Sequence, residues 1–368
     1  MKRLHFFIAF MLSLAMAVHP AFSAESSSVG IVQELLGTVS VLRNGEPLGS
    51  FDIGDSVENF DLIKTGKDGS LVVALVRGTG MAGTLIVKPN SVFTVKTAVL
   101  DGTPSTEGEL LGGSVGFKLR KISGDPQWQV RSGGTVMGIR GTDFDVSVSV
   151  NDSLLVACSD GRVECAGEDG DTQEAVPGQA VEGKAGERLR RVGVAVSSLK
   201  DFQDRWYAEE ISAFRASPVQ VLDQYARTYL RYRDSFRSAH AKLAASPVFT
   251  EWKYEFGRGV RPSANNVQTM KQKSALVPTL MAIRRVLFLF ERVYYRLDEV
   301  QSYLDAGALS ARLSSGMTVR DFLRAFGTEK TELERKTAEY RFALRLFADR
   351  NDGQDPFSLG SDEDDFFD

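Results

Sequence analysis

Alternation of apolar and polar residues, interrupted by short turn signals, is the feature that most constrains how this chain can fold. From Val29 to about Val196 the sequence repeatedly alternates, as in Val39-Ser40-Val41 and Val146-Ser147-Val148-Ser149-Val150. Such alternation is typical of half-buried β-strands. Turn signals recur along this segment at Asn44-Gly45, Gly54-Asp55, Lys67-Asp68-Gly69, Pro89-Asn90, Asp101-Gly102, Gly112-Gly113, Gly133-Gly134, Asp160-Gly161 and Pro177-Gly178. The pattern predicts an all-β sandwich or a β-solenoid-like fold with short turns.

After Val196 the pattern becomes that of helices. Helix start signals occur at Ser198 with Asp201, Ser217-Pro218, Ser246-Pro247, and Thr318 with Asp321. Three apolar stripes at spacings of three, four or seven follow: Leu222, Ala226, Tyr229, Phe236 and Leu243; Leu276, Leu280, Ile283, Leu287, Phe290, Tyr294, Leu297 and Leu304; and Val319, Phe322, Phe326, Leu333, Tyr340, Leu344 and Phe347. The middle stripe predicts a helix from roughly 279 to 305. Together the stripes favour a helical bundle or an antiparallel coiled coil with aromatic side chains in its core.

The first 23 residues have the features of a secretory signal peptide. Lys2 and Arg3 precede an apolar run from Phe6 to Val18, and small residues lead to an expected cleavage after Ser23. No cysteine lies near that point to carry a lipid, and no later stretch has the eighteen consecutive apolar residues of a membrane span. The sequence therefore predicts a periplasmic protein that is not a lipoprotein and has no transmembrane segment after processing.

Charge divides the rest of the chain into three parts. Residues 24–196, the expected all-β domain, hold 16 basic and 23 acidic side chains, whereas residues 197–348, the expected helical domain, hold 25 basic and 17 acidic ones. Residues 349–368 hold one basic and eight acidic side chains, and we expect this acidic tail to be disordered.

The two cysteines, Cys158 and Cys165, flank the turn signal Ser159-Asp160-Gly161-Arg162. Export permits a disulfide, and this turn favours a β-hairpin. In a hairpin with a two-residue turn, however, Cys158 would face Val163, and Cys165 would lie diagonally across, too distant for good disulfide geometry. The sequence leaves open both a disulfide and two free thiols.

Two glycine-rich segments match catalytic motifs but lack the structural context. Gly112-Gly113-Ser114-Val115-Gly116 fits a hydrolase nucleophile elbow, yet strand-like alternation continues where a helix is needed. The segment from Gly78 to Gly83 fits a nucleotide-binding loop, yet it leads into another strand-like run. After signal removal His240 is the only histidine, too few for a serine hydrolase or, with two cysteines, for a conventional zinc site.

Acidic clusters do not change this interpretation. Glu168-Asp169-Gly170-Asp171 and Asp349-Arg350-Asn351-Asp352-Gly353 both miss the spacing of a calcium loop and favour solvated turns. A glycosidase would need two opposed carboxylates, and the sequence singles out no such pair. We therefore predict that the protein is not an enzyme and has no catalytic residue, metal or cofactor.

Arginines concentrate on two of the expected helices. They are Arg227, Arg231, Arg233 and Arg237 on one, and Arg284, Arg285, Arg292 and Arg296 on the other. Export excludes nucleic acid as the partner. The arginines then form either a solvated face or a surface for something acidic: anionic lipid, a partner protein, or the acidic parts of this chain.

The stretch Val136-Met137-Gly138-Ile139-Arg140-Gly141-Thr142-Asp143-Phe144 resembles the signature of FecR-type periplasmic domains. Segments around Gly54, Leu85, Gly161 and Val176 are also similar to strands of that family, so the resemblance covers roughly residues 30 to 183. Within the signature, residues Ile139, Arg140, Gly141, Thr142, Asp143 and Phe144 suit a structural role. We expect Gly141 to permit a turn or a close backbone approach, Phe144 to lie in the core, and Arg140 to reach Asp143 or buried carbonyls, with ligand contact as the alternative.

The resemblance implies a β-scaffold in the cell envelope. In the namesake of the family, the domain relays a signal from a siderophore receptor to a sigma factor, but this sequence lacks the membrane span of that relay. Our first hypothesis is a non-catalytic binding or scaffold protein. Its β-domain would bind an envelope protein or a cell-wall component, and its helices would self-associate or assemble with another subunit. The alternative is a sensory accessory in an envelope or iron-uptake signalling pathway.

Overall fold

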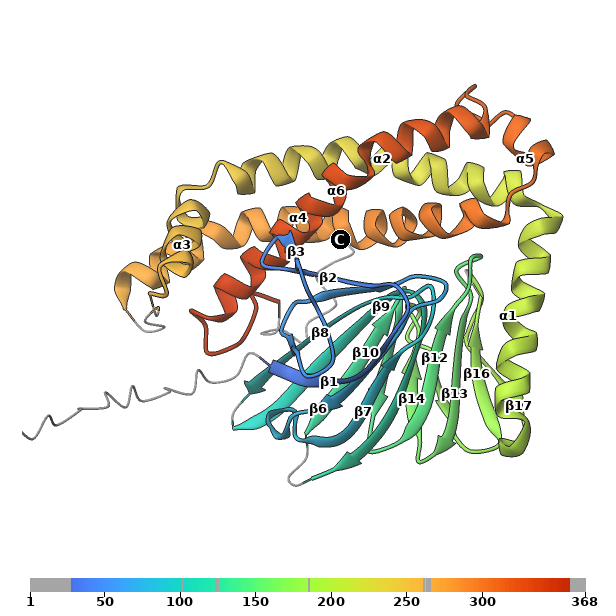
Figure 1. The fold of residues 1–368 in the computed structure, drawn as a ribbon, viewed down its shortest axis with the longest axis horizontal. Helices are drawn as coiled ribbons and strands as arrows, with labels where there is room; N and C mark the ends of the chain where they lie inside the picture. Colours follow the sequence, from blue (N-terminus) through green and yellow to red (C-terminus); the bar gives the residue numbers. More distant parts are fainter. Residues whose placement is uncertain are drawn as a thin grey trace, which may run out of the picture.

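The computed structural model describes residues 28–100, 102–122, 126–184, 186–260, 262 and 266–357. The predicted signal peptide, residues 1–23, lies outside them. An all-β module comes first and helices follow, which confirms the predicted fold class (Figure 1).

The strands form two facing layers. In the first layer the order is β4 (Ser56–Glu58), β1 (Ser28–Leu36), β6 (Ser70–Leu75), β7 (Met81–Val87), β9 (Thr103–Lys121), β12 (Asp143–Val148), β13 (Leu154–Asp160), β16 (Gln179–Gly183) and β17 (Arg190–Gly193). In the second it is β3 (Glu46–Pro47), β2 (Val39–Arg43), β5 (Leu62–Thr65), β8 (Val92–Leu100), β9, β10 (Gln127–Ser132), β11 (Thr135–Ile139), β14 (Val163–Ala166) and β15 (Thr172–Ala175). Only β9 and β10 pair in parallel among the described strands. The sheet is open.

Strand β9 belongs to both layers. Residues 103–112 pair with β8, and residues 113–121 pair with β7 and β12. The strand bends at Gly113, whose φ is +80° and where a Cβ atom would lie 2.4 Å from the carbonyl oxygen of Asn90. Only glycine fits such a position without displacing backbone. Gly112-Gly113, predicted to be a turn, is therefore a bend within one strand.

Aromatic side chains fill the space between the layers. The ring of Phe117 stacks on Phe144 at 4.7 Å and meets the edges of Phe93 and Trp128, each at 6.3 Å. Phe93 and Trp128 come from the second layer, and the other two from the first. The indole nitrogen of Trp128 donates a hydrogen bond to the carbonyl of Thr79, so its polar atom is satisfied.

The helices are α1 (Leu199–Ala216), α2 (Pro218–Ala244), α3 (Pro247–Gly257), α4 (Val267–Val300), α5 (Ala306–Ser310) and α6 (Val319–Ala348), with 3₁₀ turns η1 (Arg77–Thr79), η2 (Val196–Ser198) and η3 (Gln301–Tyr303). Helix α4 begins earlier than predicted and continues through Pro278. The three predicted stripes are buried, apart from the half-buried Leu304, and they form one core. A bundle of α2, α4 and α6 lies across one end of the strand module, and α1 runs down its side (Figure 1).

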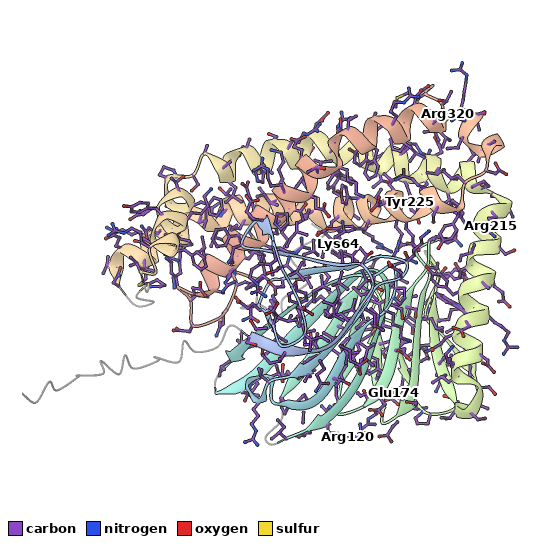
Figure 2. All side chains as sticks on the ribbon, viewed as in Figure 1. Lys64, Arg120, Glu174, Arg215, Tyr225 and Arg320 are labelled. Atoms are coloured by element: carbon purple, nitrogen blue, oxygen red, sulfur yellow. The ribbon has the colours of Figure 1, made fainter. Side chains whose placement is uncertain are left out.

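The bundle and the strand module share a hydrophobic core. Leu62 and Val150 belong to the same buried cluster as the helix stripes. Polar contacts reinforce the junction: Tyr225 donates to the carbonyl of Val150 at 2.7 Å, and Lys64 pairs with Glu334. Both labelled side chains, Lys64 and Tyr225, lie where helices meet strands (Figure 2). The two parts are therefore one packed unit.

The prediction that residues 349–368 are disordered is wrong for 349–357. Asp355 is 1% exposed and pairs with Lys96 of β8, and the guanidinium carbon of Arg284 lies 4.3 Å from the ring centroid of Phe357. The ion pair of Asp355 with Lys96 and the cation–π contact of Phe357 with Arg284 hold residues 349–357 against the rest of the protein. Residues 358–368 lie outside the described residues.

A buried ion pair lies near the junction of helices and strands. Glu291 of α4 and Arg341 of α6 are joined at 2.7 Å, and Tyr295 of α4 and Glu109 of β9 influence the pair. Burial raises the pKa of Glu291 to about 7, which outweighs the opposing effect of the Arg341 guanidinium.

This pKa predicts a pH-dependent stability. A carboxyl group with a higher pKa in the folded state binds a proton on folding, so its contribution is full below about pH 4.5 and is lost as the pH rises to about 7. Glu291→Gln should remove this dependence, which amounts to at most about 3 kcal/mol. Urea unfolding of the unmodified protein and the variant across this pH range measures the difference.

Glu209→Gln serves as the matched control, because Glu209 is exposed on α1. A free energy of unfolding that varies with pH in the same way in the unmodified protein and in Glu291→Gln would contradict the assignment.

Candidate functional site

The signature stretch forms an arch between the layers. Residue Ile139 ends β11 in the second layer, and Asp143 begins β12 in the first. The chain crosses between them through Gly141, whose φ is +62°, and the carbonyl of Thr142 accepts from the amide of Leu119 at 3.0 Å. Glycine suits this position because a left-handed φ is strained for residues with a Cβ atom.

Two buried side chains hold the arch on the side that faces the core. Phe144 is 3% exposed and stacks on Phe117 in the core between the layers. Thr142 is fully buried, and it packs so closely on the turn at Gly161 that a Cβ atom there would lie 2.5 Å from the Thr142 methyl group. The arch backbone is therefore fixed on its inner side.

Arg140 does not take the predicted role. Its side chain is exposed and forms no ion pair with any residue in the described part of the chain. Asp143 is bound instead by Arg120 of β9, with Nη1 and Oδ1 separated by 2.7 Å. The reason is the arch: Arg140 precedes the left-handed residue and points outward, whereas Asp143 follows it on a strand beside β9.

Several charged side chains surround Arg140, and we call this set the arch surface: Arg120, Arg140, Asp143, Asp160 and Arg162. Ile139 pairs with Val163, which places Arg140 and Arg162 at the same end of two adjacent strands. Arg120 also approaches Asp160 at 3.5 Å. Figure 2 shows Arg120 at the end of the strand module opposite the helical bundle. An exposed guanidinium group on a fixed backbone can bind a carboxylate or phosphate through two hydrogen bonds.

The predicted hairpin around Asp160-Gly161 is wrong. Cys158 lies on β13 of the first layer, and Cys165 lies on β14 of the second, so the turn is a second arch between layers. Both thiols are buried and unbonded. Burial raises the pKa of Cys158 to about 11 and that of Cys165 to about 12. Thiols in this state do not act as nucleophiles.

The rejected motifs are accounted for by the fold. Ser114 lies within β9, and its hydroxyl is 2.9 Å from that of Ser147 on β12. The segment from Gly78 to Gly83 forms η1 and the start of β7. His240 is buried in α2, with its Nε2 2.7 Å from Glu339. Among the residues that the structure describes, no group of three or more His, Cys, Asp or Glu could hold a metal ion.

A shallow recess of about 360 Å³ lies between α1 and strands β16 and β17. Its buried carboxylate, Glu182, accepts from the indole of Trp206 at 2.9 Å and from the guanidinium of Arg190. These bonds hold α1 against the first layer. The carboxylate thus has a structural role.

No helix in the described part of the chain combines the length and the apolar character of a membrane span.

Comparison with known proteins agrees with the signature. The model of the family described as FecR protein matches residues 61–164, which include the whole arch. The resemblance expected from the sequence is confirmed, and this segment is a FecR domain. The comparison with curated proteins finds no match.

Two crystal structures share limited similarity with the chain. Both are described as a "putative anti-sigma factor" from Parabacteroides distasonis. The first is 13% identical, with a TM-score of 0.31 over 39% of this chain and 64% of the other. The second is 11% identical, with a TM-score of 0.26 over 45% of this chain and 63% of the other. This chain thus spans less than two thirds of either.

The sequence singled out the signature stretch but not the salt bridge that holds Asp143. Arg120 lies 23 positions before Asp143, and no local spacing links them. Their contact depends on the register in which β9 pairs with β12.

We expect the native thiols to be unreactive. Exposed thiols react with Ellman's reagent near pH 8, whereas buried ones with a raised pKa should show almost no reaction until the protein unfolds. The absorbance of the released product should therefore indicate no reactive thiol in the native protein and two in the denatured protein, with no reductant added. If the denatured protein showed no reactive thiol, Cys158 and Cys165 would be joined in a disulfide, which would contradict the structure.

Proposed function

We propose that this protein is a non-catalytic accessory of envelope signalling, whose FecR domain binds a protein partner through the arch surface. The observation that carries the proposal is the exposure of Arg140 on an arch whose neighbouring residues Thr142 and Phe144 are buried. The family match supports a regulatory rather than an enzymatic role.

The charges of the arch surface favour an acidic contact on the partner. Asp143 and Asp160 already share Arg120, and Arg162 lies 3.6 Å from Glu174. Arg140 has no such partner in the described chain. A carboxylate from another protein would complete its hydrogen bonding in a bidentate pair.

The helices suit a second role at the opposite end. They pack on the strand module through a shared core, so partner binding at the arch leaves the bundle accessible (Figure 1). An accessory with two separate surfaces can link a sensing component to a second protein. The predicted signal peptide and the FecR domain both support a periplasmic site for this activity.

Arg140→Glu should disrupt partner binding without unfolding the protein. A reversed charge at a charge-assisted pair costs at least about 1.4 kcal/mol, a tenfold loss of affinity. The test captures crosslinked partners from envelope extracts with each variant, and it records envelope-stress and iron-response transcripts in strains carrying the same substitutions.

Arg188→Glu is the control because that side chain is 82% exposed on a different surface. Equal capture by both variants would contradict binding at the arch. Reduced capture with unchanged transcripts would argue for a scaffold rather than a signalling accessory.

A scaffold that self-associates through its helices is the second candidate. Its support is a group of exposed apolar side chains at the tip formed by α3 and α4: Tyr254, Val260, Val267 and Met270, which are 48–69% exposed. Apolar side chains gathered on one protruding tip are typical of contact surfaces.

Val267→Asp combined with Met270→Asp should then weaken self-association by at least about tenfold, because two charges enter an apolar contact. Light scattering across a range of protein concentrations measures this change. Leu36→Asp, at a residue 62% exposed on β1, is the matched control. Monomers at every concentration in the unmodified protein would rule out this candidate.

A further inference from the structure

Helix α4 exposes an apolar face in its second half. Phe288 is 49% exposed and Leu289 is 37% exposed, although neighbouring residues Leu287 and Phe290 are buried in the core. Arg285 precedes them by three and four positions, so the three side chains share one helix face. We call this set the α4 face.

Arg285 differs from the other arginines of α4. Arg292 binds Asp152 with its Nε 2.8 Å from Oδ1, and Arg296 binds Glu299 at 2.8 Å. Arg285 is exposed and has no ion pair with any residue that the structure describes. The α4 face thus combines two exposed apolar side chains with an unneutralised positive charge.

The C-terminal segment of the chain approaches this face. Asp355 is fixed by Lys96, and Phe357 lies against Arg284, the residue next to Arg285. Phe357 is the last described residue. Four residues, about 6 Å of helix rise, separate Arg284 from Phe288 along the axis. The following residues therefore start within a short reach of the α4 face.

The sequence of those residues is complementary to the α4 face. Residues 358–368 include five acidic side chains, with Phe366 and Phe367 among them. For a random coil, the nine-residue separation from Phe357 to Phe366 gives a mean end-to-end distance of about 17 Å, which exceeds the axial separation of Arg284 and Phe288.

We propose that residues 358–368 dock on the α4 face of the same molecule. Phe366 and Phe367 cover Phe288 and Leu289, and the acidic residues before them neutralise Arg285. The short tether favours this occupant over a second copy, because it raises the local concentration of the segment to roughly millimolar. Docking is independent of the arch surface, which lies at the other end of the strand module.

Disulfide trapping in the full-length protein tests the contact. Phe288→Cys and Phe366→Cys are combined in one chain, and the rate of disulfide formation under mild oxidation is followed by mass spectrometry. Docking should make this rate at least about tenfold higher than in a control pair of Arg231→Cys with Phe366→Cys. Arg231 is exposed on α2, and the native cysteines are buried, so neither complicates the readout.

Two further experiments change the charge of the α4 face and place the two cysteines on separate molecules. Arg285→Glu and raised salt should each slow trapping in the Phe288→Cys pair, because both weaken attraction to the acidic residues. Equal trapping rates in the two cysteine pairs would overturn the proposal. Rates that do not change with salt or with Arg285→Glu would also overturn it. Efficient crosslinking between separate Phe288→Cys and Phe366→Cys molecules would identify a second copy as the occupant and overturn it as well.

Discussion

The passage of β9 from one layer to the other is the constraint on which the architecture depends. A single strand supplies neighbours to β8 and β10 in the second layer and to β7 and β12 in the first. The bend needs glycine at position 113, because a side chain would collide with the backbone at Asn90 and Ser91. Beyond the bend, the same strand delivers Phe117 to the centre of the core, where it touches aromatic rings from both layers.

Helix α4 covers the end of the strand module at which this bend lies. Arg296 lies so close to Gly112 that a Cβ atom there would be 3.0 Å from its Nη1, and Arg292 lies equally close to Gly133. Both arginines lie near Asp152 in the turn between β12 and β13, so α4 is fixed over this end. The arch lies at the opposite end of β12 and stays exposed. The arch surface and the helical bundle are thus separated on one packed unit, as the proposed linking role requires.

Charge segregation along the chain is largely resolved within the fold. The basic helices neutralise acidic residues of the strand module, as in Arg292 with Asp152, and acidic residues of one another, as in Arg233 with Glu329. The acidic C-terminal segment returns to the strands through Asp355 and Lys96. Of the arginines that the sequence singles out on α4, Arg285 alone keeps an exposed, unpaired charge in the described chain, which makes it the exception that needs a partner.

The sequence by itself determined the features that depend on neighbours along the chain. Alternation at positions such as Val146 and Val148 specified strands, spacing of three and four specified the buried stripes of α2, α4 and α6, and the signature identified the FecR domain. Tertiary structure alone decided which layer each strand joins. The turn at Asp160-Gly161 is therefore an arch, and the two cysteines lie on strands of different layers as free thiols. It also assigned Asp143 to Arg120 rather than to Arg140. Pairing between distant segments follows from packing of the whole core, and local sequence spacing carries no record of it.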